Sequence, residues 1–363
     1  MAVTEQGLLA ALTSVQDPHT GQDFVSTRAL RNVQIHGGDV AFDVELGYPA
    51  KSLLPELRRS LVAAAKGVAG VENVSVNITT KVLAHAVQRG VQLLPQVKNI
   101  IAVASGKGGV GKSTTAANLA LALAAEGASV GVLDADIYGP SQPMMMGINR
   151  RPESDDGKTM EPLENYGVQV MSIGFLVDQD EAMIWRGPMA TQALEQLLRQ
   201  TNWKDLDYLI IDMPPGTGDI QLTLSQRVPM TGAVIVTTPQ DIALLDAKKG
   251  IKMFEKVGVP ILGIVENMAV HVCSNCGQVE HIFGADGGKK MAADYGMDYL
   301  GALPLDMSIR LQADSGKPTV VADPDGEVAQ IYKKVAREVA VKIARQAKDF
   351  SSKFPTISIS KNT

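Results

Sequence analysis

The sequence has little of several features that mark special classes of protein. Aromatic residues make up 4% of its 363 residues, two residues are cysteine, and no apolar run approaches the length of a membrane span. Acidic residues outnumber basic ones by 39 to 34, and this net charge of −5 argues against nucleic acid as the main partner. The start of the chain lacks the basic segment of a signal peptide. We therefore expect a cytoplasmic protein with no nucleic-acid and no membrane partner.

The rest of the composition is that of a globular protein with more than one domain. Hydrophobic residues make up 45% of the chain and charged residues 20%, and the length allows two domains with a large core. We expect a small α/β (α+β) domain at residues 1–90, a linker at 91–98, a larger domain at 99–350 and a tail at 351–363. The small domain is interpreted as a module that binds a partner.

Within the small domain, the hydrophobic pattern predicts two helices and three strands. The predicted segments are a helix at 7–12, strands at 25–35 and 40–46 joined by a hairpin turn at 36–39, a helix at 51–66 and a strand at 70–78.

A glycine-rich loop opens the larger domain. Residues 106–113 fit G-x-x-x-x-G-K-[ST], the phosphate-binding P-loop, and lie between an apolar run and a predicted helix. Glycines let the backbone fold so that its N–H groups face phosphates at the positive end of a helix. In such a loop Lys112 would neutralise phosphate charge, and the Ser113 hydroxyl would bind Mg²⁺.

The same loop also fits a second motif. Gly106, Gly108 and Gly111 match the dinucleotide fingerprint G-x-G-x-x-G, and Asp134 lies near the position expected for an acid that binds ribose. Lys112 and Ser113, directly after the third glycine, favour the P-loop, because a dinucleotide site has no need of a lysine and a metal-binding hydroxyl there. An ordinary glycine-rich turn is the third alternative, and the strand–loop–helix context argues against it.

Short apolar runs separated by helical stretches continue through the larger domain. They lie at residues 100–104, 129–133, 168–173, 208–211, 233–237 and 261–265. This pattern predicts a doubly wound, mostly parallel α/β sheet that is covered on both faces. A last helix at 328–347 has one apolar face with basic residues beside it; we expect it to pack on the sheet, and a membrane-surface helix is the alternative.

Acidic residues follow two of these strands. Asp134 and Asp136 come after the second strand, and Asp212 ends the fourth, before a stiff Pro-Pro-Gly loop. Ligands of parallel α/β sheets lie beyond the carboxyl ends of the strands, so we expect these acids to face the phosphates. Asp212 fits the acid that holds Mg²⁺ through its waters, and the first pair suits a magnesium-shell group and a group that orients water. Asp219 could cap the following helix or belong to the site.

The two cysteines, Cys273 and Cys276, are spaced as a C-x-x-C-G knuckle. Iron–sulfur clusters typically need four thiolates, so two copies of the chain facing each other would complete a site and predict a homodimer. Alternatively, the flanking His271 and His281 could complete a Cys₂His₂ zinc site within one chain. A redox dithiol is the third reading, although no βαβ redox context surrounds the pair.

Taken together, these motifs resemble the Mrp/ApbC family of iron–sulfur cluster carrier ATPases. That family belongs to the deviant-Walker P-loop group with MinD, ParA and the nitrogenase iron protein. The resemblance covers most of residues 98–345, and the small domain resembles one found in other cluster-assembly factors. The segments that carry it are residues 106–114, 134–141, 185–188 (Trp185 to Pro188), 212–219 and 273–276.

The resemblance implies a role for each matching residue. Lys107 would be a signature lysine that reaches the partner's phosphates, and Lys112 and Asp136 would complete the catalytic set. Magnesium would be held by Ser113, Asp134 and Asp212, and a bridging [4Fe–4S] cluster by Cys273 and Cys276. Asn267 would read the adenine, with residues 304–306 near the base. The nucleotide-binding residues would be Gly106, Gly108, Gly109, Val110, Gly111, Lys112, Ser113, Thr114 and Asn267.

The function expected from this reading is ATP-dependent cluster carriage. The protein would be a homodimeric ATPase with ATP and Mg²⁺, delivering a [4Fe–4S] cluster to apo iron–sulfur proteins and working with cluster-assembly scaffold proteins. Two rivals use the same fold: a MinD- or ParA-type positioning ATPase, and an ATP-dependent reductase that contains a cluster. The cysteine pair and the net charge oppose the first rival.

Overall fold

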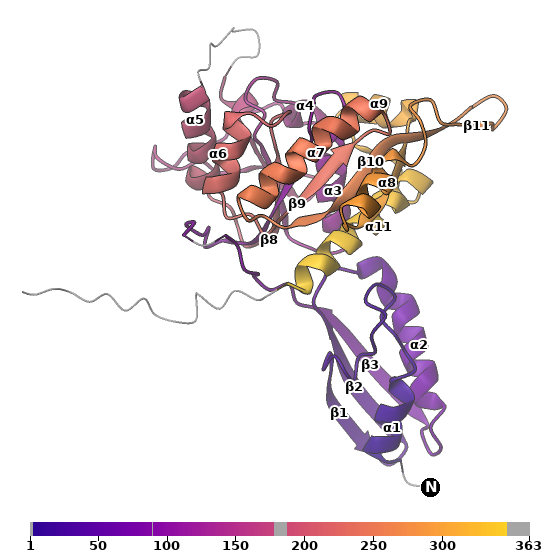
Figure 1. Ribbon diagram of the computed structural model, residues 1–363. Coiled ribbons are helices and arrows are strands. Elements are labelled where there is room, and N and C mark those ends of the chain that lie inside the picture. Colours follow the sequence, from indigo (N-terminus) through magenta and orange to yellow (C-terminus); the bar gives the residue numbers. More distant parts are fainter. Residues whose placement is uncertain (1–2, 89, 178–186, 347–363) are drawn as a thin grey trace, which may run out of the picture.

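The computed structural model describes residues 3–88, 90–177 and 187–346, arranged as a small sheet domain below a larger α/β domain (Figure 1). Trp185 and Arg186 of the predicted motif, and the predicted tail at 351–363, lie outside the described residues. Within the described residues, no helix is long and apolar enough to cross a membrane.

The N-terminal domain is a three-stranded sheet with two helices, as the pattern predicts. Strand order is β1-β2-β3, with β1 and β2 antiparallel and β2 and β3 parallel. Leu8, Leu12, Phe42 and Leu61 are among the side chains that fill its core. Its elements are α1 (Glu5–Leu12), β1 (Leu30–His36), β2 (Asp39–Leu46), η1 (Lys51–Leu53), α2 (Leu54–Lys66) and β3 (Asn73–Thr80).

The first strand begins later than predicted. The apolar run suggested a start at residue 25, but the Asp23 carboxylate accepts hydrogen bonds from the backbone N–H groups of Val25 and Ser26 and closes a turn there. Short polar side chains often compete with strand pairing in this way. The strand therefore starts at Leu30.

The larger domain contains a nine-stranded sheet of the predicted doubly wound type. Its order is β11-β10-β9-β4-β8-β5-β7-β6, and β12 also pairs with β10. All its pairs are parallel except β10 with β11 and β6 with β7. The strands are β4 (Val97–Ala104), β5 (Val130–Asp134), β6 (Leu163–Asn165), β7 (Val168–Ser172), β8 (Leu206–Asp212), β9 (Gly232–Thr237), β10 (Ile261–Val272), β11 (Val279–Glu280) and β12 (Tyr299–Pro304).

The six apolar runs all form strands, and three further strands were not predicted. β6 and β11 escape a pattern search because they have only three and two residues, and β12 was missed as well. β10 runs well past its predicted end at residue 265, because β12 and β11 pair with its second half. β4 begins at Val97, two residues inside the predicted linker.

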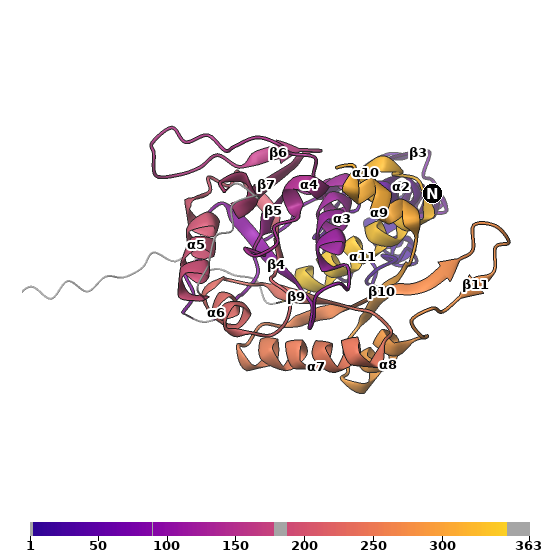
Figure 2. The same cartoon turned by 90° about the horizontal axis from the view of Figure 1, so that it is seen from above.

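Helices cover both faces of the sheet (Figure 2). α3 (Lys112–Ala125) and α11 (Glu327–Ala344) pack together on one face, and α7 (Asp241–Lys256) and α8 (Gly287–Asp294) lie on the other. Val335, Val339 and Ile343 of α11 are buried, so its apolar face is already covered by protein, as expected from a packing helix rather than a membrane-surface one. The remaining helices are α4 (Gln142–Met145), η2 (Ile173–Phe175), α5 (Gly187–Gln200), α6 (Asp219–Arg227), α9 (Met307–Asp314) and α10 (Thr319–Ala322).

A buried polar cluster joins the two domains. Glu126, at the end of α3, accepts hydrogen bonds from the backbone N–H and the hydroxyl of Ser52 at 2.9 and 2.7 Å. Arg337 of α11 pairs with the same carboxylate at 2.6 Å and donates to Nε2 of His19 at 3.1 Å. Burial and the neighbouring Arg337 lower the pKa of His19, which suits a neutral ring that accepts this bond. The helix that starts at the P-loop therefore ends on the N-terminal domain.

We predict that Arg337→Leu loosens this junction. Removing one partner of a buried pair leaves an uncompensated charge and costs about 3–5 kcal/mol, and the Glu126 side chain here is 1% exposed. Hydrogen exchange of the amides in residues 49–54 should become faster. Lys334→Leu on the same helix is the matched control, because Lys334 is 65% exposed and its ion pair with Glu338 measures 3.9 Å. Equal exchange in the two variants would contradict the assignment.

Candidate functional site

The P-loop joins the end of β4, near the middle of the sheet, to the start of α3. Gly109 and Gly111 have φ of +80° and +82°, a conformation that L side chains rarely adopt. Gly106 lies against α7, where an added Cβ would come within 2.1 Å of the Asp246 backbone. The loop thus has the glycines its shape requires, and its N–H groups lie at the positive end of α3.

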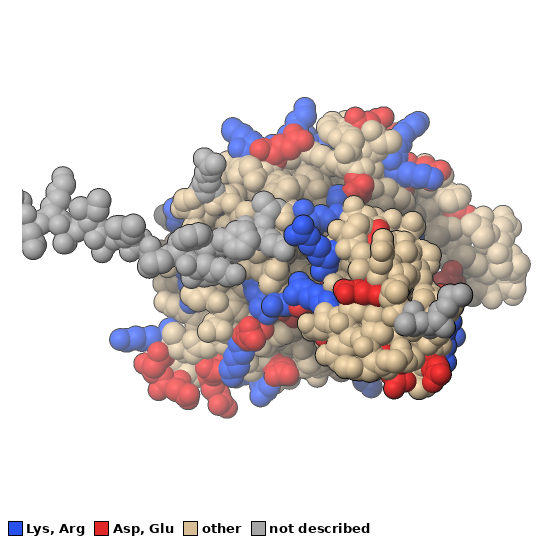
Figure 3. All heavy atoms as spheres, turned by 90° about the horizontal axis from the view of Figure 1, so that it is seen from below, with Lys and Arg blue, Asp and Glu red and all other residues tan. Residues whose placement is uncertain are grey.

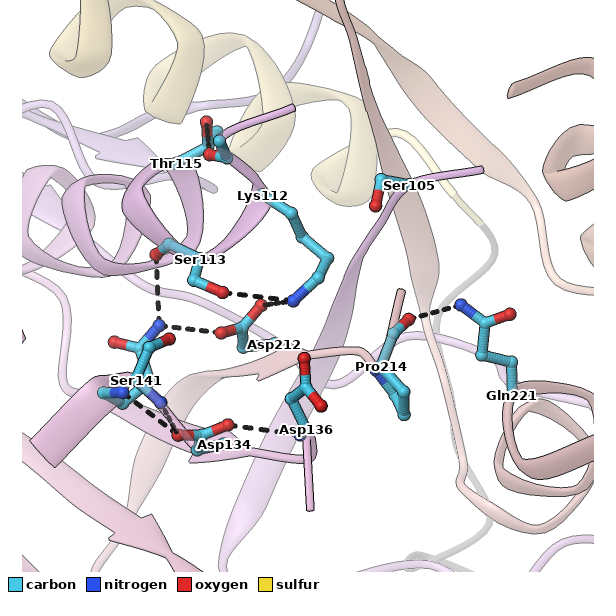
Figure 4. A network of polar contacts seen from close by, with 12 residues as sticks. Ser105, Lys112, Ser113, Thr115, Asp134, Asp136, Ser141, Asp212, Pro214 and Gln221 are labelled. Atoms are coloured by element: carbon cyan, nitrogen blue, oxygen red, sulfur yellow. Dashed lines mark hydrogen bonds and ion pairs between the residues drawn. The ribbon is translucent and has the colours of Figure 1, made fainter. Parts of the chain in front are cut away.

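A buried ion pair lies at the head of α3 (Figure 4). The Lys112 ammonium contacts the Asp212 carboxylate and also donates to the Ser113 hydroxyl at 3.2 Å. The two charged side chains are 6% and 0% exposed. Val103 of β4 pairs in register with Asp212 of β8, and this register brings the acid beside the loop. The three residues predicted for phosphate and Mg²⁺ therefore converge.

Gln142, the first residue of α4, is a site residue that the sequence reasoning missed. Its side-chain amide donates to the other Asp212 oxygen at 2.9 Å and to the backbone carbonyl of Ser113 at 3.1 Å, and it is fully buried. It directly follows the predicted motif at residues 134–141. The only sequence signal for Gln142 as a site residue is its position beside the acidic motif. Its contacts arise only when α4 packs against the site.

Asp134 holds the loop after β5 in place. Its carboxylate accepts hydrogen bonds from the backbone N–H groups of Asp136, Ser141 and Gln142 at 3.0–3.2 Å and from the Ser172 hydroxyl at 3.1 Å. Burial, followed by the nearby Asp212 charge, raises its pKa to about 7. With four hydrogen bonds on a fully buried carboxylate, Asp134 is set to position its neighbours; its predicted magnesium role stays a prediction.

Asp136 is less buried than Asp134, the other acid after β5. It is half-buried, and burial raises its pKa while the nearby Lys112 charge lowers it. In the close-up its carboxyl group points toward the space between Asp212 and Pro214 (Figure 4). A carboxyl group with a raised pKa beside the phosphate loop suits proton transfer or the orientation of water.

Lys107 and Asn267, both predicted site residues, differ in their contacts. Lys107 is half-buried, and its ammonium makes no hydrogen bond or ion pair with any described residue. Asn267 donates from its amide to the Val110 carbonyl at 2.8 Å, and an added Cβ on Gly111 would lie 2.1 Å from that amide nitrogen. Asn267 therefore braces the P-loop directly, and adenine recognition by it stays a prediction. Thr114 follows Ser113 in the first turn of α3.

The loop after β8 is also fixed against the P-loop. The backbone N–H of Gly216 donates to the Ser105 carbonyl at 3.2 Å, and the Gln221 amide donates to the Pro214 carbonyl. Gln221 was not predicted either. Asp219 is exposed in the first turn of α6, where an acid favours the positive helix end, and makes no side-chain capping bond.

Cys273 and Cys276 lie at the tip of a hairpin formed by β10 and β11, which projects from the body of the larger domain (Figure 2). The Cys273 N–H donates to the Gln278 carbonyl at 2.9 Å, and the Gly277 N–H donates to the Cys273 carbonyl at 2.8 Å. Gly277 has φ of +73°, as this turn requires. The predicted knuckle is present, with Cys276 exposed.

The flanking histidines do not complete a metal site with the cysteines. Nδ1 of His271 lies 2.9 Å from the Leu305 carbonyl, and Nδ1 of His281 lies 2.9 Å from the Ala269 carbonyl. Among the described residues, no group of three or more His, Cys, Asp or Glu side chains is placed to hold a metal ion. The single-chain Cys₂His₂ arrangement considered above is not formed. The described part of the chain thus provides two thiols without further metal ligands.

The family of the chain can now be read from comparisons with known proteins. Residues 96–340 match the sequence profile described as NUBPL iron-transfer P-loop NTPase, and residues 5–78 match the profile described as iron-sulfur cluster assembly protein. The chain belongs to the NUBPL iron-transfer P-loop NTPase family. The first profile covers the P-loop, the acids and the cysteine hairpin; the second covers the N-terminal sheet domain.

Relatives in this family align over most of their length. An iron-sulfur cluster carrier protein of Pseudomonas fragi is 61% identical over 278 residues, which are 76% of this chain and 97% of that protein. One of Escherichia coli (strain K12) is 51% identical over 333 residues, 92% of this chain and 90% of that protein. A nucleotide-binding protein from Archaeoglobus fulgidus, solved in complex with ADP, is 38% identical, covers 64% of this chain and 90% of its own, and superposes with a TM-score of 0.56.

We predict that Gly106→Ala destabilises this NTPase domain more than Gly108→Ala. The first Cβ would press on the α7 backbone, whereas the nearest atom to the second would be Pro215 Cβ at 3.8 Å. Forcing an atom into packed backbone typically costs about 1–3 kcal/mol. Urea unfolding followed by circular dichroism measures the difference. Equal stability of the two variants would show that the loop does not depend on its contact with α7.

We predict that the Cys273 thiol of the apo-protein ionises at a lower pH than an ordinary cysteine thiol. Backbone N–H groups of Asn275 and Cys276, and then the Cys276 thiol, donate to its sulfur and lower its pKa below the ordinary 9.0. Alkylation with iodoacetamide over a pH series, with the modified residue identified by mass spectrometry at early times, gives the midpoint. A midpoint at or above 9.0 for Cys273 would contradict the hydrogen-bonded knuckle.

Proposed function

We propose that this chain is an ATPase that carries an iron–sulfur cluster and transfers it to apo-proteins. The observation that carries the proposal is the presence on one chain of a P-loop site and of two paired thiols that have no third metal-binding side chain among the described residues. The family match and the relatives named as cluster carriers support it. The cluster is then cargo, bound at the exposed hairpin tip where a recipient can reach it.

The residues at the head of α3 fit a magnesium nucleotide. Mg²⁺ prefers oxygen ligands, and the Ser113 hydroxyl and the Asp212 carboxylate supply them beside the Lys112 charge. Bound there, Mg²⁺ would neutralise charge on the phosphates. Lys112 would then exchange its carboxylate partner for phosphate oxygens, and Gln142 would keep Asp212 oriented through its other oxygen.

Hydrolysis would use the acid after β5 and a lysine from a second chain. Asp136 would orient the attacking water and accept its proton, for which a raised pKa is suited. Asp134 would act as a positioning residue through its hydrogen bonds to the Asp136 loop. Lys107, whose ammonium has no partner among the described residues, would stabilise phosphate charge across a dimer.

Exposed apolar side chains on the cysteine hairpin and on α7 support a homodimer. Val272, Val279 and Ile282, on and just after the cysteine hairpin, are 52–58% exposed. Ile242 and Leu245 form an exposed apolar stripe on α7, the helix that contacts Gly106, and are 64% and 57% exposed. Large apolar side chains gathered near two incomplete sites are typical of a surface that another protein covers. A second copy of the chain would bring the missing thiolates.

One strand connects the nucleotide to the cargo. β10 carries Asn267, which contacts the P-loop carbonyl of Val110, and ends at Val272, directly before Cys273. A change at the loop can therefore reach the hairpin along β10, whose pairing is interrupted between Glu266 and Val270, where Met268 has φ of +57°. We propose that nucleotide state changes how the two hairpins face each other, and hence how tightly the cluster is held. The N-terminal domain, which matches a cluster-assembly profile, would contact scaffold proteins.

Reconstitution with iron and sulfide under anaerobic conditions tests this function. The wild-type chain should bind iron and sulfide and activate an apo-enzyme that requires a [4Fe–4S] cluster. The double variant Cys273→Ser/Cys276→Ser should bind neither iron nor sulfide yet keep the nucleotide affinity of the cluster-free wild-type chain, because no hydrogen bond among the described residues joins the hairpin tip to the P-loop. Lys112→Ala should still bind iron and sulfide, but its nucleotide affinity should fall by about tenfold or more.

Two results would contradict the proposal. A wild-type chain that holds one zinc ion per monomer would show that the cysteines serve another purpose. A reconstituted chain that reduces an acceptor in the presence of ATP but activates no apo-enzyme would favour the reductase alternative.

A further inference from the structure

A cavity of about 250 Å³ lies between the N-terminal domain and the end of α11, far from both sites described above. Its walls come from the turn before β1, from β1 and β2, from the segment after β3 and from the last turns of α11. Phe24, Leu46 and Val341 form an apolar part of the lining. Figure 3 shows Lys and Arg side chains gathered where the two domains meet.

The charges around the cavity are unbalanced. Four cations line it: Arg28, Arg31, Lys81 and Arg345. Among the residues that the structure describes, Arg31 alone of these four has an acidic partner, Glu45 at 3.1 Å. The second acid, Asp17, is already used by hydrogen bonds from two backbone N–H groups and from the Tyr48 hydroxyl.

The remaining cations come from three separate segments. The Arg345 guanidinium donates to the Thr20 carbonyl and has no acidic partner in the described part of the chain. The side chains of Arg28 and Lys81 make no hydrogen bond or ion pair with a described residue. Arg28 has φ of +58°, so the backbone holds it in a conformation that costs about 1 kcal/mol or more outside glycine. An excess of positive charge in a cavity is notable on a chain whose net charge is −5.

We propose that this cavity binds a carboxylate-bearing ligand at the junction of the two domains. Guanidinium groups bind carboxylates through two parallel hydrogen bonds, and Lys81 adds a further positive charge. The volume is below the range of drug-sized sites, so it suits a small dicarboxylate or one or two acidic side chains of a peptide. Residues 347–363 of the chain itself carry three lysines and one aspartate, so their charge does not complement the cavity.

Because the walls belong to both domains, the ligand would hold the domains together. It would bridge Arg28 and Lys81 of the N-terminal domain to Arg345 of α11. The site is separate from the proposed ATPase and cluster chemistry and does not depend on either.

Titration calorimetry on the full chain tests the site with two probes, succinate and a blocked hexaglutamate peptide. Mg–ADP is present throughout to occupy the phosphate loop. The test variant is Arg28→Gln/Lys81→Gln. The matched control is Arg59→Gln/Lys66→Gln, which removes the same two charge types from exposed positions on α2 of the same domain. Both pairs lack partners among the described residues, so both variants should fold.

We expect saturable binding of at least one probe, weakened about tenfold or more in the test variant and unchanged in the control. Binding of succinate alone identifies a free carboxylate as the ligand, and binding of the peptide alone identifies an acidic segment of a partner protein. The proposal is overturned if neither probe binds, if both variants weaken binding equally, or if neither variant changes it.

Discussion

The buried ion pair between Lys112 and Asp212 is the interaction on which the nucleotide site depends. Its two side chains are almost completely removed from water, and such a pair typically gains little stability over apolar residues of the same size. The pair matters because of where its two charges lie. The register of β4 with β8 places Asp212 beside the P-loop, and Gln142 donates to its second carboxylate oxygen. In the proposed function, phosphate would replace Asp212 beside Lys112, and magnesium would replace Lys112 beside Asp212, so each side chain would keep a partner of the same charge sign. The charges of Lys112 and Asp212 would therefore be neutralised both before and after a nucleotide binds.

Two elements connect the nucleotide site to other parts of the molecule. Along β10, Asn267 joins the P-loop to the cysteine hairpin, where two thiols stand without further ligands from the described residues. Along α3, the helix that begins at Lys112 ends at Glu126, which binds Ser52 and Arg337 at the domain junction. Under the proposed function, a nucleotide-dependent shift of the loop would be transmitted to the hairpin along β10 and to the N-terminal domain along α3. The first path includes the irregular stretch of β10 between Glu266 and Val270.

Much of this arrangement could be predicted from sequence because its signals are local. Short apolar runs identified six strands, and the lysine and serine after the third glycine distinguished a P-loop from a dinucleotide loop. Gln142, Ser172 and Gln221 could not be found in this way, because their contacts arise only when separate segments pack. The Arg337–Glu126 pair joins residues 211 positions apart, and the strands β6, β11 and β12 depend on the partners they pair with. The sequence also could not decide on the single-chain zinc site, because only the fold shows that His271 and His281 contact backbone carbonyls.

In the proposed function, each chain holds half of a cluster site. Native mass spectrometry of the anaerobically reconstituted protein tests it most directly, because it weighs the intact assembly and its inorganic content together. The account predicts a dimer whose excess mass corresponds to one [4Fe–4S] cluster, and a bare monomer when Cys273 and Cys276 are replaced by serine. A monomer that carries its own metal, or a dimer with one metal centre in each chain, would contradict it.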